Sequence, residues 1–423
     1  MMTADQIRSL QPALAALLET FRPYMGQASN FGHLLVYVLG LIADLKRKSI
    51  EPIALAAGTA VRTLQEFLSF LDWHHEAANA HLQRVVMDRH ASERAIGVID
   101  ACGHAKQGRM TPGVERQWCG ESGKIDNCVV GQHLLYSDNH SSNPFNCALS
   151  SDLFLPKSWA QDAQRRRKAH IPEEVVYRPK WRIALDQLKQ AIAQGVRFWF
   201  LVFDEDYGKV PRFWFDLDAL GQQAIGEVPK NFYVFAKRPA CRSPQKAHGA
   251  KRVDNLCRFS PLFHEQPWQR VTVREATRGP IEWDIKMARV HLVVSKPKPS
   301  RPTDRQYALI VARKVGTNQI KYFISNASAA VPLADLLRAA FARWQIELWF
   351  ERAKQEAGLG AFEVRTYRSV LRHWFCSRLA MYFLAAQTQR LRGEKSGNHT
   401  GTSGRSGQCP GVDPLETLVA LAG

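Results

Sequence analysis

The chain has 423 residues, 45% hydrophobic and 23% charged, which is typical of a globular protein large enough for two or three domains. It carries 57 Lys and Arg against 39 Asp and Glu, a formal net charge of +18, and no apolar run is long enough to span a membrane. The N-terminus lacks the features of a signal peptide. This surplus indicates a polyanionic partner, with nucleic acid as the first candidate and an anionic membrane as the second.

The positive charge is unevenly distributed along the chain. Residues 1–90 contain eight Lys or Arg and eight Asp or Glu, so the whole surplus lies in residues 91–423. The eight cysteines are scattered and form no CxxC pair. We therefore expect a cytosolic protein with reduced thiols and a basic body, without a membrane partner.

Residues 4–92 are predicted to form helices, because apolar residues recur at helical spacing in segments such as HLLVYVLGLIADLKRK. In SIEPIALAAGTAVRTLQEFLSFLDW, Gly58 separates a short apolar helix from a second one. This pattern is typical of a DNA-binding helix-turn-helix, with Arg62 on the second helix. A plain helical hairpin inside a bundle has the same pattern, so both interpretations stay open.

From residue 96 the pattern changes to strands. IGVID, KIDNCVVGQHLLYS, NCALSSDLFLP and FWFLVFDEDYG read as strands, and PKWRIALDQLKQAIAQG reads as a helix between the last two. The nearly continuous apolar run of FWFLVF is typical of a central strand buried on both faces. Residues 211–325 mix strand-like pieces (FYVFAKR, ALIVARK, KYFISN) with connectors rich in Pro and Lys. The overall expectation is a multidomain α/β protein.

Two helices are predicted near the C-terminus, over residues 338–357 and 367–390. Along the first, Arg343, Glu347 and Lys354 fall within about 40° of one another at 100° per residue. A solvated stripe with an ion pair explains such a line of charges, and so does the face of an active site. The Gly- and Ser-rich residues 391–413 are predicted to be disordered.

Two of the predicted strands end in an acid, Asp100 after IGVI and Asp204 after FLVF. Side chains at such strand ends point into the crevice where α/β proteins bind ligands. Together with Glu347 they would form three carboxylates that repel one another unless cations hold them. Oxygen ligands suit Mg²⁺, and two such ions can promote phosphodiester chemistry.

The alternative is that these acids are unrelated. Strands often end in Asp because they end at turns, so two such residues and a helical Glu can occur together by chance. Glu205 and Asp206 compete with Asp204, and Glu351 competes with Glu347. Spacing alone does not decide among them.

Several stretches together resemble the DDE transposases of bacterial insertion sequences, most closely the insertion sequence 701 family, a relative of the insertion sequence 4 group. The resemblance covers about residues 35–385. It rests on LADLKRKSIEPIALAAG, VIDACGHAKQG, VERQWCGESGKIDNCVVG, LFLPKSWAQDAQRRRKAHIP, FDEDYG and RWQIELWFERAKQEAGL, which occur in the family's order. The last stretch is similar to the family's Tyr-x2-Arg-x3-Glu-x6-Lys signature.

The resemblance implies that Asp100, Asp204 and Glu347 are the catalytic, metal-binding triad. It also implies two Mg²⁺ ions, with Mn²⁺ able to substitute. The residues expected to contact DNA are Arg343, Lys354, Arg62, Lys106, Arg165 and Arg166. The chain departs from the family where Ala340 replaces the signature Tyr, and where ACGHA follows Asp100 in place of an acid, Thr and Gly-Phe-Pro.

The implied fold is an RNase H-like catalytic core with a strand-rich insertion and an all-helical N-terminal DNA-binding domain. The 142 residues between Asp204 and Glu347 are too many for a simple connection, which agrees with an inserted domain. In the related group this insertion contacts DNA, so Trp268 and Trp283 are candidates to stack on an unpaired base. The expected divisions are 1–93 (helical), 94–210 and 326–390 (core), 211–325 (insertion) and 391–423 (flexible tail).

The resemblance implies a transposase that cleaves double-stranded DNA at the ends of a mobile element and transfers the 3′-OH strand into target DNA. It would act as a homodimer in the synaptic complex, in the bacterial cytoplasm at the nucleoid. Two alternatives stay open. One is a catalytically inactive DNA-binding regulator or relic of a transposase, which the unusual segment after Asp100 keeps open, and the other is a metal-dependent nuclease without strand transfer.

Overall fold

The computed structural model describes residues 10–140, 144–238, 249–274, 280–295 and 300–397. Backbone contacts divide the chain into two compact units. The first unit comprises Met1–Ser92, Ala101–Val196 and Ile346–Gly423, and the second comprises Glu93–Asp100 and Arg197–Gln345. Both units mix helices with a sheet, which confirms the predicted α/β class. No helix within the described residues is long and apolar enough to cross a membrane.

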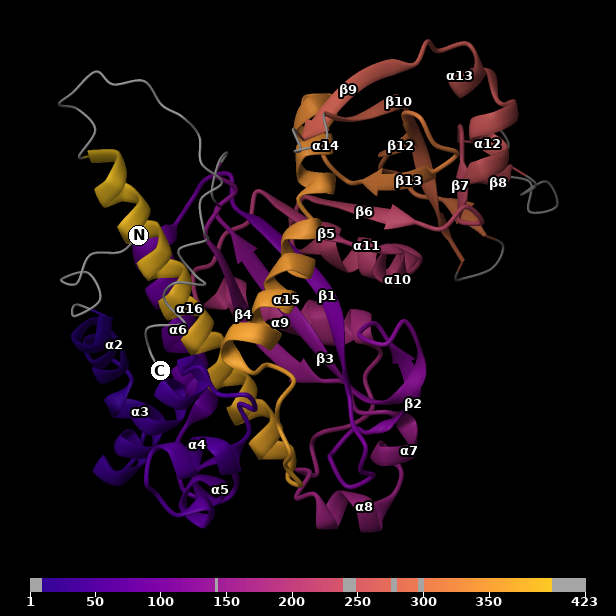
Figure 1. Cartoon of the computed structure of the whole chain (residues 1–423). Helices are drawn as coiled ribbons and strands as arrows, with labels where there is room; N and C mark the ends of the chain where they lie inside the picture. Colours follow the sequence, from indigo (N-terminus) through magenta and orange to yellow (C-terminus); the bar gives the residue numbers. More distant parts are fainter. Residues whose placement is uncertain (1–9, 141–143, 239–248, 275–279, 296–299, 398–423) are drawn as a thin grey trace. The chain divides into compact units, whose positions relative to one another are not determined.

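The N-terminal part of the first unit is helical, as predicted. It contains α2 (Leu10–Glu19), a 3-10 turn (Arg22–Tyr24), α3 (Ala28–Ile42), α4 (Ile50–Ala56), α5 (Val61–Ser69) and α6 (His75–His90). Helices α2, α3, α5 and α6 pack along the long C-terminal helix α16 (Tyr367–Gly397), drawn in yellow in Figure 1, and α4 packs against α3 and α5. By contacts they belong to the same unit as residues 101–196, so the proposed boundary at residue 93 stays a prediction.

The sheet of the first unit is antiparallel. The first part of strand β3 (Lys124–Ser137) pairs with β2 (Glu115–Cys119). The second part of β3, from Gly131 onward, pairs with β4 (Asn146–Leu153). Helix α9 (Lys180–Ala193) covers β3 and β4 with its apolar face, and the short helices α7 (Lys157–Ala160) and α8 (Ala163–Lys168) precede it. The strands and the helix predicted between residues 124 and 195 are thereby confirmed.

The second unit is built on a mixed sheet. Strands β1 (Ile96–Ala105), β5 (Phe200–Phe203) and β6 (Ala224–Val228) are parallel neighbours, and β1 continues past Asp100 into the first unit. The order then runs antiparallel through β13 (Ile320–Ser325), β12 (Tyr307–Lys314) and β10 (Ile281–Val294). The remaining strands pair around β10, namely β7 (Tyr233–Phe235), β8 (Ala250–Arg252), β9 (Gln269–Arg274) and β11 (Arg301–Pro302).

Short helices flank this sheet. They are α10 (Glu205–Gly208), α11 (Pro211–Ala219), α12 (Val253–Phe259), α13 (Pro261–His264) and α14 (Leu333–Phe341). The strand-rich character predicted for residues 211–325 is confirmed, and these strands share a compact unit with β5. Trp283 is 4% exposed on β10, so the expectation that it stacks on a DNA base is wrong, because its ring belongs to the core.

Three predicted boundaries need correction. The strand expected to end at Asp100 continues to Ala105. The helix expected over residues 338–357 is two helices, α14 and α15 (Trp344–Ala357), with Arg343 in the turn between them. Helix α15 ends before Gly358, as predicted, because Gly358 adopts a φ of +59° that favours glycine.

The C-terminal helix is longer than predicted. Helix α16 continues to Gly397, past residue 391 where the flexible tail was expected to begin. The rest of that tail, and residues 4–9 of the first predicted helix, lie outside the described residues.

Candidate active site

Asp100 and Asp204 each come directly after the paired stretch of two neighbouring parallel strands. Ile99 pairs with Phe203 in the register between β1 and β5. Asp100 is the next residue within β1, and Asp204 is the residue that follows β5. Adjacent strands lie about 5 Å apart, and side chains at matched positions point to the same face. The second unit therefore places two of the predicted carboxylates on neighbouring segments, directly after the stretch in which β1 and β5 pair.

The sequence after β5 turns the chain sharply and fixes Asp204. Its side-chain oxygen accepts a hydrogen bond from the backbone N–H of Asp206 at 2.9 Å, which caps α10. Tyr207 is buried against the ring of Phe203. Gly208 lies so close to β6 that an added Cβ would stand 1.9 Å from the carbonyl oxygen of Glu227, so this position requires glycine.

The competing acids of this segment have other partners or positions. Asp206 forms an exposed ion pair with Lys209 at 2.6 Å, and Glu205 is exposed on α10. Asp204 alone continues the strand direction of β5. This geometry favours Asp204 among the three acids, which was the preference drawn from the sequence.

Arg343 contacts the first aspartate. Its Nη1 lies 3.1 Å from Oδ2 of Asp100, and the two side chains are 23% and 16% exposed. The sequence placed Arg343 on a helical face with Glu347 and Lys354, but it precedes α15 and points to the strand edge instead. A partly buried ion pair of this kind fixes the orientation of both side chains.

The two aspartates suit a hard divalent cation. Both are partly buried, and Mg²⁺ is commonly held by one or two carboxylates together with water and substrate phosphates. Among the described residues, no three His, Cys, Asp or Glu side chains are grouped closely enough to hold a metal by themselves. The donor set at this edge thus fits Mg²⁺ bound in part by a phosphate substrate.

The other predicted residues of the signature lie on α15 in the first unit. Glu347 is in the first turn and is exposed, as is Glu351 one turn later. Lys354 is 24% exposed, with its Nζ 3.7 Å from Oε2 of Glu121. The role of Glu347 as the third carboxylate stays a prediction.

The segment that departs from the family pattern forms the second half of β1. His104 is fully buried beside Phe362 and Trp374, and within the described part of the chain neither ring nitrogen has a hydrogen-bond partner. Burial, first of all, lowers its pKa well below the usual value, and Lys354 contributes. His104 is therefore a neutral core residue, which explains its position inside an apolar strand.

Lys106 and Arg166 donate to backbone carbonyls, although the sequence predicted them as DNA contacts. The Nζ of Lys106 lies 2.9 Å from the oxygen of Gly360 and 2.7 Å from that of Phe362, and burial lowers its pKa to about 8. Arg166 donates to Pro172 at 2.6 Å and to Val175 at 2.7 Å. Both side chains thus hold neighbouring segments of the first unit together.

The two remaining predicted DNA contacts are Arg62 and Arg165. Arg62 on α5 has a side chain that is 72% exposed and pairs with Glu66 one turn later. Arg165 on α8 lies with its guanidinium carbon 3.8 Å from the ring centroid of Trp159.

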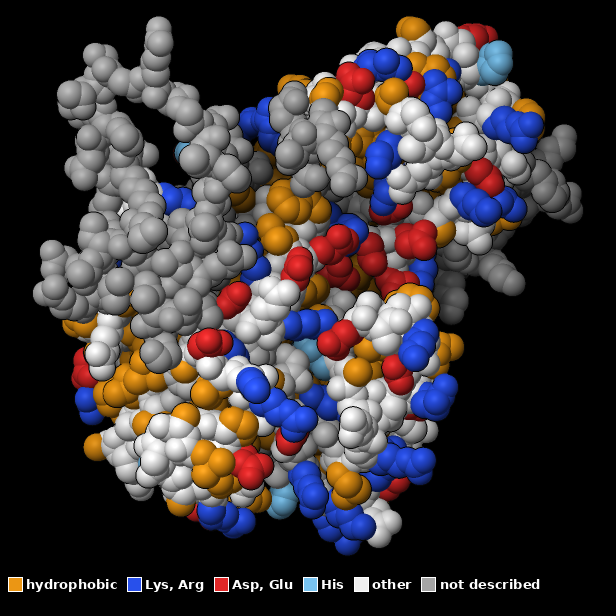
Figure 2. Space-filling view, in the orientation of Figure 1, with side chains coloured by type: hydrophobic (Ala, Val, Ile, Leu, Met, Phe, Trp, Pro, Cys, Tyr) orange, Lys and Arg blue, Asp and Glu red, His pale blue; other side chains and the backbone are white. Residues whose placement is uncertain are grey.

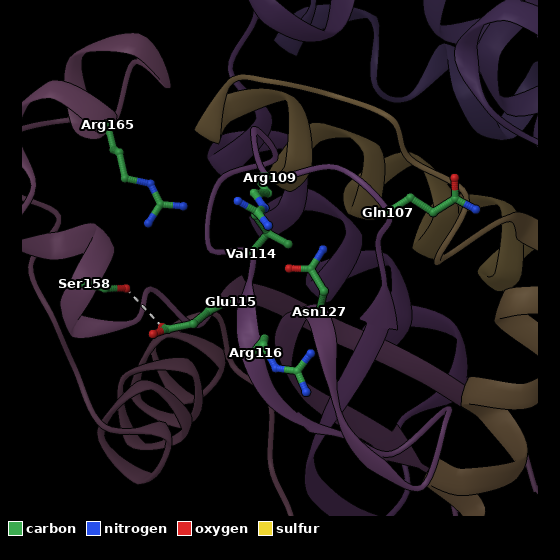
Figure 3. Close-up of a pocket in the computed structure, with 8 residues that line it drawn as sticks. All are labelled: Gln107, Arg109, Val114, Glu115, Arg116, Asn127, Ser158 and Arg165. Carbon is green, nitrogen blue, oxygen red and sulfur yellow. Dashed lines mark hydrogen bonds between the residues drawn. The ribbon is translucent and has the colours of Figure 1, made fainter.

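Arg165 also borders a cavity of about 380 Å³ in the first unit, called the arginine cavity below (Figure 3). Two further arginines line it that were not predicted from the sequence, Arg109 and Arg116. Nothing in the sequence distinguishes them from other basic residues except their positions, since Arg109 follows the stretch VIDACGHAKQG and Arg116 lies within VERQW. The complete lining is Gln107, Arg109, Val114, Glu115, Arg116, Asn127, Ser158 and Arg165.

A comparison with known families matches a large part of the chain. A model described as DDE superfamily endonuclease matches residues 20–285, well over half of the chain. The chain belongs to this family. The matched region of this DDE endonuclease includes Asp100 and Asp204 and ends before Glu347.

A curated relative agrees with the resemblance to the insertion sequence 701 type. The DDE endonuclease is 27% identical over 198 residues to the probable transposase for insertion sequence element IS701 of Microchaete diplosiphon. That alignment covers 46% of this chain and 48% of the relative, so the chain spans about half the length of the relative it matches.

A solved structure with some likeness is the piggyBac transposase in a synaptic complex with hairpin DNA. It shares 10% identity with a TM-score of 0.40, over 99% of this chain and 77% of the other.

Proposed function

We propose that this DDE endonuclease is a transposase that cleaves DNA at the ends of an insertion sequence and joins the freed 3′-OH to target DNA. The observation that carries the proposal is the pair of aspartates that directly follow the paired residues Ile99 and Phe203 of β1 and β5, with Arg343 bonded to Asp100. The parallel strands β1, β5 and β6 would form the RNase H-like core. Family membership and the similarity to an insertion sequence 701 transposase support this choice of reaction.

Each side chain then has a defined task. Asp100 and Asp204 would hold Mg²⁺, and Glu347 would complete the carboxylate set. Bound Mg²⁺ would supply a polarised, more acidic oxygen nucleophile and charge stabilisation at the scissile phosphate. Arg343 would keep Asp100 oriented until the cation and DNA arrive, and would then be free to contact a phosphate oxygen.

The reaction needs no covalent enzyme intermediate. In the first step the oxygen of water attacks the phosphorus at the element's end, and the bond to the 3′ oxygen breaks to leave a 3′-OH. In the second step that 3′-OH attacks a target phosphodiester, and the displaced strand leaves as a new 3′-OH. The chain's contribution is positioning and charge stabilisation, which suits a site of carboxylates and one arginine.

The partners follow from this chemistry. The N-terminal helices, with Arg62 exposed on α5, would recognise the terminal repeats, and Lys354 would hold the DNA backbone near the signature helix. Bringing two ends together requires a homodimer in the synaptic complex. Action on chromosomal and element DNA places the enzyme in the bacterial cytoplasm at the nucleoid.

The test uses labelled duplex DNA carrying the gene's own flanking ends, with Mg²⁺ or Mn²⁺. Asp100→Asn, Asp204→Asn and Glu347→Gln should each lower cleavage by about 10²–10³-fold while DNA binding and the melting temperature are retained. Glu351→Gln is the matched control, since Glu351 is an equally exposed acid one turn away, and it should cut like the wild type.

The outcomes separate the alternatives. If the wild type binds the ends but does not cut them, the regulator interpretation replaces the enzyme. If it cuts but never joins a labelled 3′ end to a plasmid target, the protein is a nuclease. If Glu351→Gln loses cleavage and Glu347→Gln keeps it, the third carboxylate has been assigned to the wrong residue.

A further inference from the structure

The arginine cavity has more positive than negative side chains in its lining. Arg109, Arg116 and Arg165 line it together with one acid, Glu115, which leaves an excess of two positive charges (three minus one). Among the described residues, no ion pair joins any of these three arginines to a carboxylate. Figure 2 shows Lys and Arg side chains gathered over the surface of α8 and around β2.

The arginines come from three different segments that converge on one space. Arg109 is in the loop after β1, Arg116 is on β2 and Arg165 is on α8. In Figure 3 the side chain of Arg165 extends toward Arg109. Like charges brought together repel, so this convergence raises the free energy of the protein until an anion is present.

Arg165 is held in position before any ligand binds. Its guanidinium stacks over the ring of Trp159, which is 2% exposed and donates its indole N–H to the oxygen of Val114 at 2.8 Å. A stacked guanidinium loses less conformational entropy on binding than a mobile one. This contact also leaves all the N–H donors of Arg165 available for a ligand.

The loop that carries Arg109 is fixed by Asn127 on β3. The Nδ2 of Asn127 donates to the oxygen of Lys106 at 2.5 Å and to that of Gly108 at 2.9 Å. The carboxylate of Glu115 accepts a hydrogen bond from Ser158 at 3.0 Å, so the one acid of the lining is turned to α7. In the lining of the cavity, Glu115 is hydrogen-bonded to Ser158, and the side-chain N–H groups of the three arginines are available to a ligand.

The neighbouring hairpin offers an apolar surface beside this charge. Trp118 on β2 pairs across the strands with Ile125 on β3, and the two side chains are 62% and 61% exposed. Two residues along each strand, on the same face, are Arg116 and Asn127 of the cavity. A cationic pocket next to an exposed indole suits a ligand that alternates phosphates with flat, partly apolar groups, as a nucleic-acid strand does.

We propose that Arg109, Arg116 and Arg165 bind a backbone phosphate of DNA, and that Trp118 contacts the adjoining nucleotide. This rests on the proposed action on DNA and adds a site outside the carboxylate edge. A guanidinium group can donate two parallel hydrogen bonds to the oxygens of a phosphate. Three guanidinium groups therefore supply enough donors for one backbone phosphate and its neighbour. This contact does not depend on the base sequence, and it holds the DNA backbone against the protein.

The experiment measures equilibrium binding of the full chain to a fluorescent duplex, in EDTA so that cleavage plays no part. Arg109→Gln and Arg165→Gln should each weaken binding about tenfold at 0.15 M salt. Each should also lower the slope of log K against log salt by about 1, because one fewer counterion is released. Trp118→Ala should weaken binding with the salt slope unchanged.

Two matched variants keep the result interpretable. Arg167→Gln removes an exposed arginine from the same helix that does not line the cavity, so affinity and slope should stay at the wild-type values. Glu115→Gln removes the one acid of the lining, and binding should become about fivefold tighter. A loss of structure cannot produce that gain.

Several results would overturn the proposal. The cavity is not a phosphate site for DNA if Arg109→Gln and Arg165→Gln weaken binding no more than Arg167→Gln, or if Glu115→Gln leaves affinity unchanged. If pyrophosphate raises the melting temperature of the wild type but not of Arg165→Gln, while DNA affinity is equal in both, the ligand is a small phosphate compound. Because EDTA removes the metal, a failure of cleavage in the earlier test leaves these results readable.

Discussion

The first unit contains two groups of basic side chains that look alike in the sequence and differ in their surroundings. Arg372 is 1% exposed and donates to the carbonyl oxygens of Phe67, Leu68, Leu71 and Trp73, at distances from 2.7 to 3.4 Å. The arginines of the arginine cavity have no such acceptors among the described residues. The net charge of +18 therefore includes two kinds of basic side chain. Some stabilise the fold by donating to buried carbonyl oxygens, and others line a cavity that can take a ligand.

Buried cations of the first group join segments far apart in the chain. Arg378, 3% exposed, binds the side chain of Asn79 at 2.6 Å and the carbonyl of Leu149 at 2.9 Å. Through these contacts α16 is tied to the N-terminal helices and to β4. The terminal N–H groups of Arg372 and Arg378 donate to oxygens within the protein, and both side chains are buried, so they have little to offer a DNA phosphate.

The largest expected effect on stability comes from removing one of the buried arginines, Arg372. Arg372→Met should lower the free energy of unfolding by about 3–5 kcal/mol, because four carbonyl contacts lose a charged donor inside the core. Denaturation in urea measures the loss. DNA affinity, determined where the variant is folded, should equal that of the wild type, and a large change in the salt slope would show that the two groups are not separate.

The second prediction concerns acid. Burial lowers the pKa of His133 to about 3 and that of His373 to about 4, below the value near 6.5 of an unfolded chain. The unfolded state therefore binds more protons below pH 6.5, and stability is present above that pH and is lost as the pH falls. For each histidine, the free energy of unfolding should fall by about 2 kcal/mol between pH 7 and pH 5.

The pH dependence can be assigned with one pair of variants. His373 bonds to Tyr37 at 2.8 Å and to the carbonyl of Gly358 at 2.9 Å, so His373→Gln should reduce the loss between pH 7 and pH 5 by about 2 kcal/mol. Exposed His140→Gln should leave the loss as in the wild type. Equal behaviour of the two variants would contradict the assignment of the acid sensitivity to buried neutral histidine.

The smallest expected effect compares two neighbours on α8. Arg166→Gln should lower stability by about 1–2 kcal/mol, because its carbonyl contacts to Pro172 and Val175 are lost, with DNA affinity unchanged. Arg165→Gln should instead weaken DNA binding and change the free energy of unfolding by less than about 1 kcal/mol. If Arg166→Gln lowers the salt slope by about 1, then a carbonyl-bonded arginine can also bind phosphate, and the division fails.

The elements were largely predictable from the sequence. Periodic apolar residues determined α3, α5 and α9, and the apolar run FWFLVF determined β5 as a buried strand. The break between α14 and α15 was not predictable, because no Gly or Pro marks it and Arg343 is a good helix former. That Asp100 lies inside a longer strand was hidden because the residues after it, Cys102 and His104, are buried in the other unit's core.

The candidate site divides in the same way. Motif order and strand ends pointed to Asp100 and Asp204, and parallel pairing of β1 with β5 supplied the register that makes them neighbours. The six basic residues expected at DNA could not be ranked, since a lysine in a sequence carries no information about its acceptors. Lys106 proved to be bonded to two carbonyls, and Arg109 proved to line a cavity.

Local pattern and the order of short motifs were enough to predict the family, the mixed helices and strands, and the two aspartates that follow apolar runs. Which cations are structural and which are available for a ligand depends on the packing of the folded chain. That distinction depends on whether a guanidinium or ammonium group meets a carbonyl oxygen from a distant segment. Such meetings are set by how helices and strands pack, and no spacing along the chain encodes them.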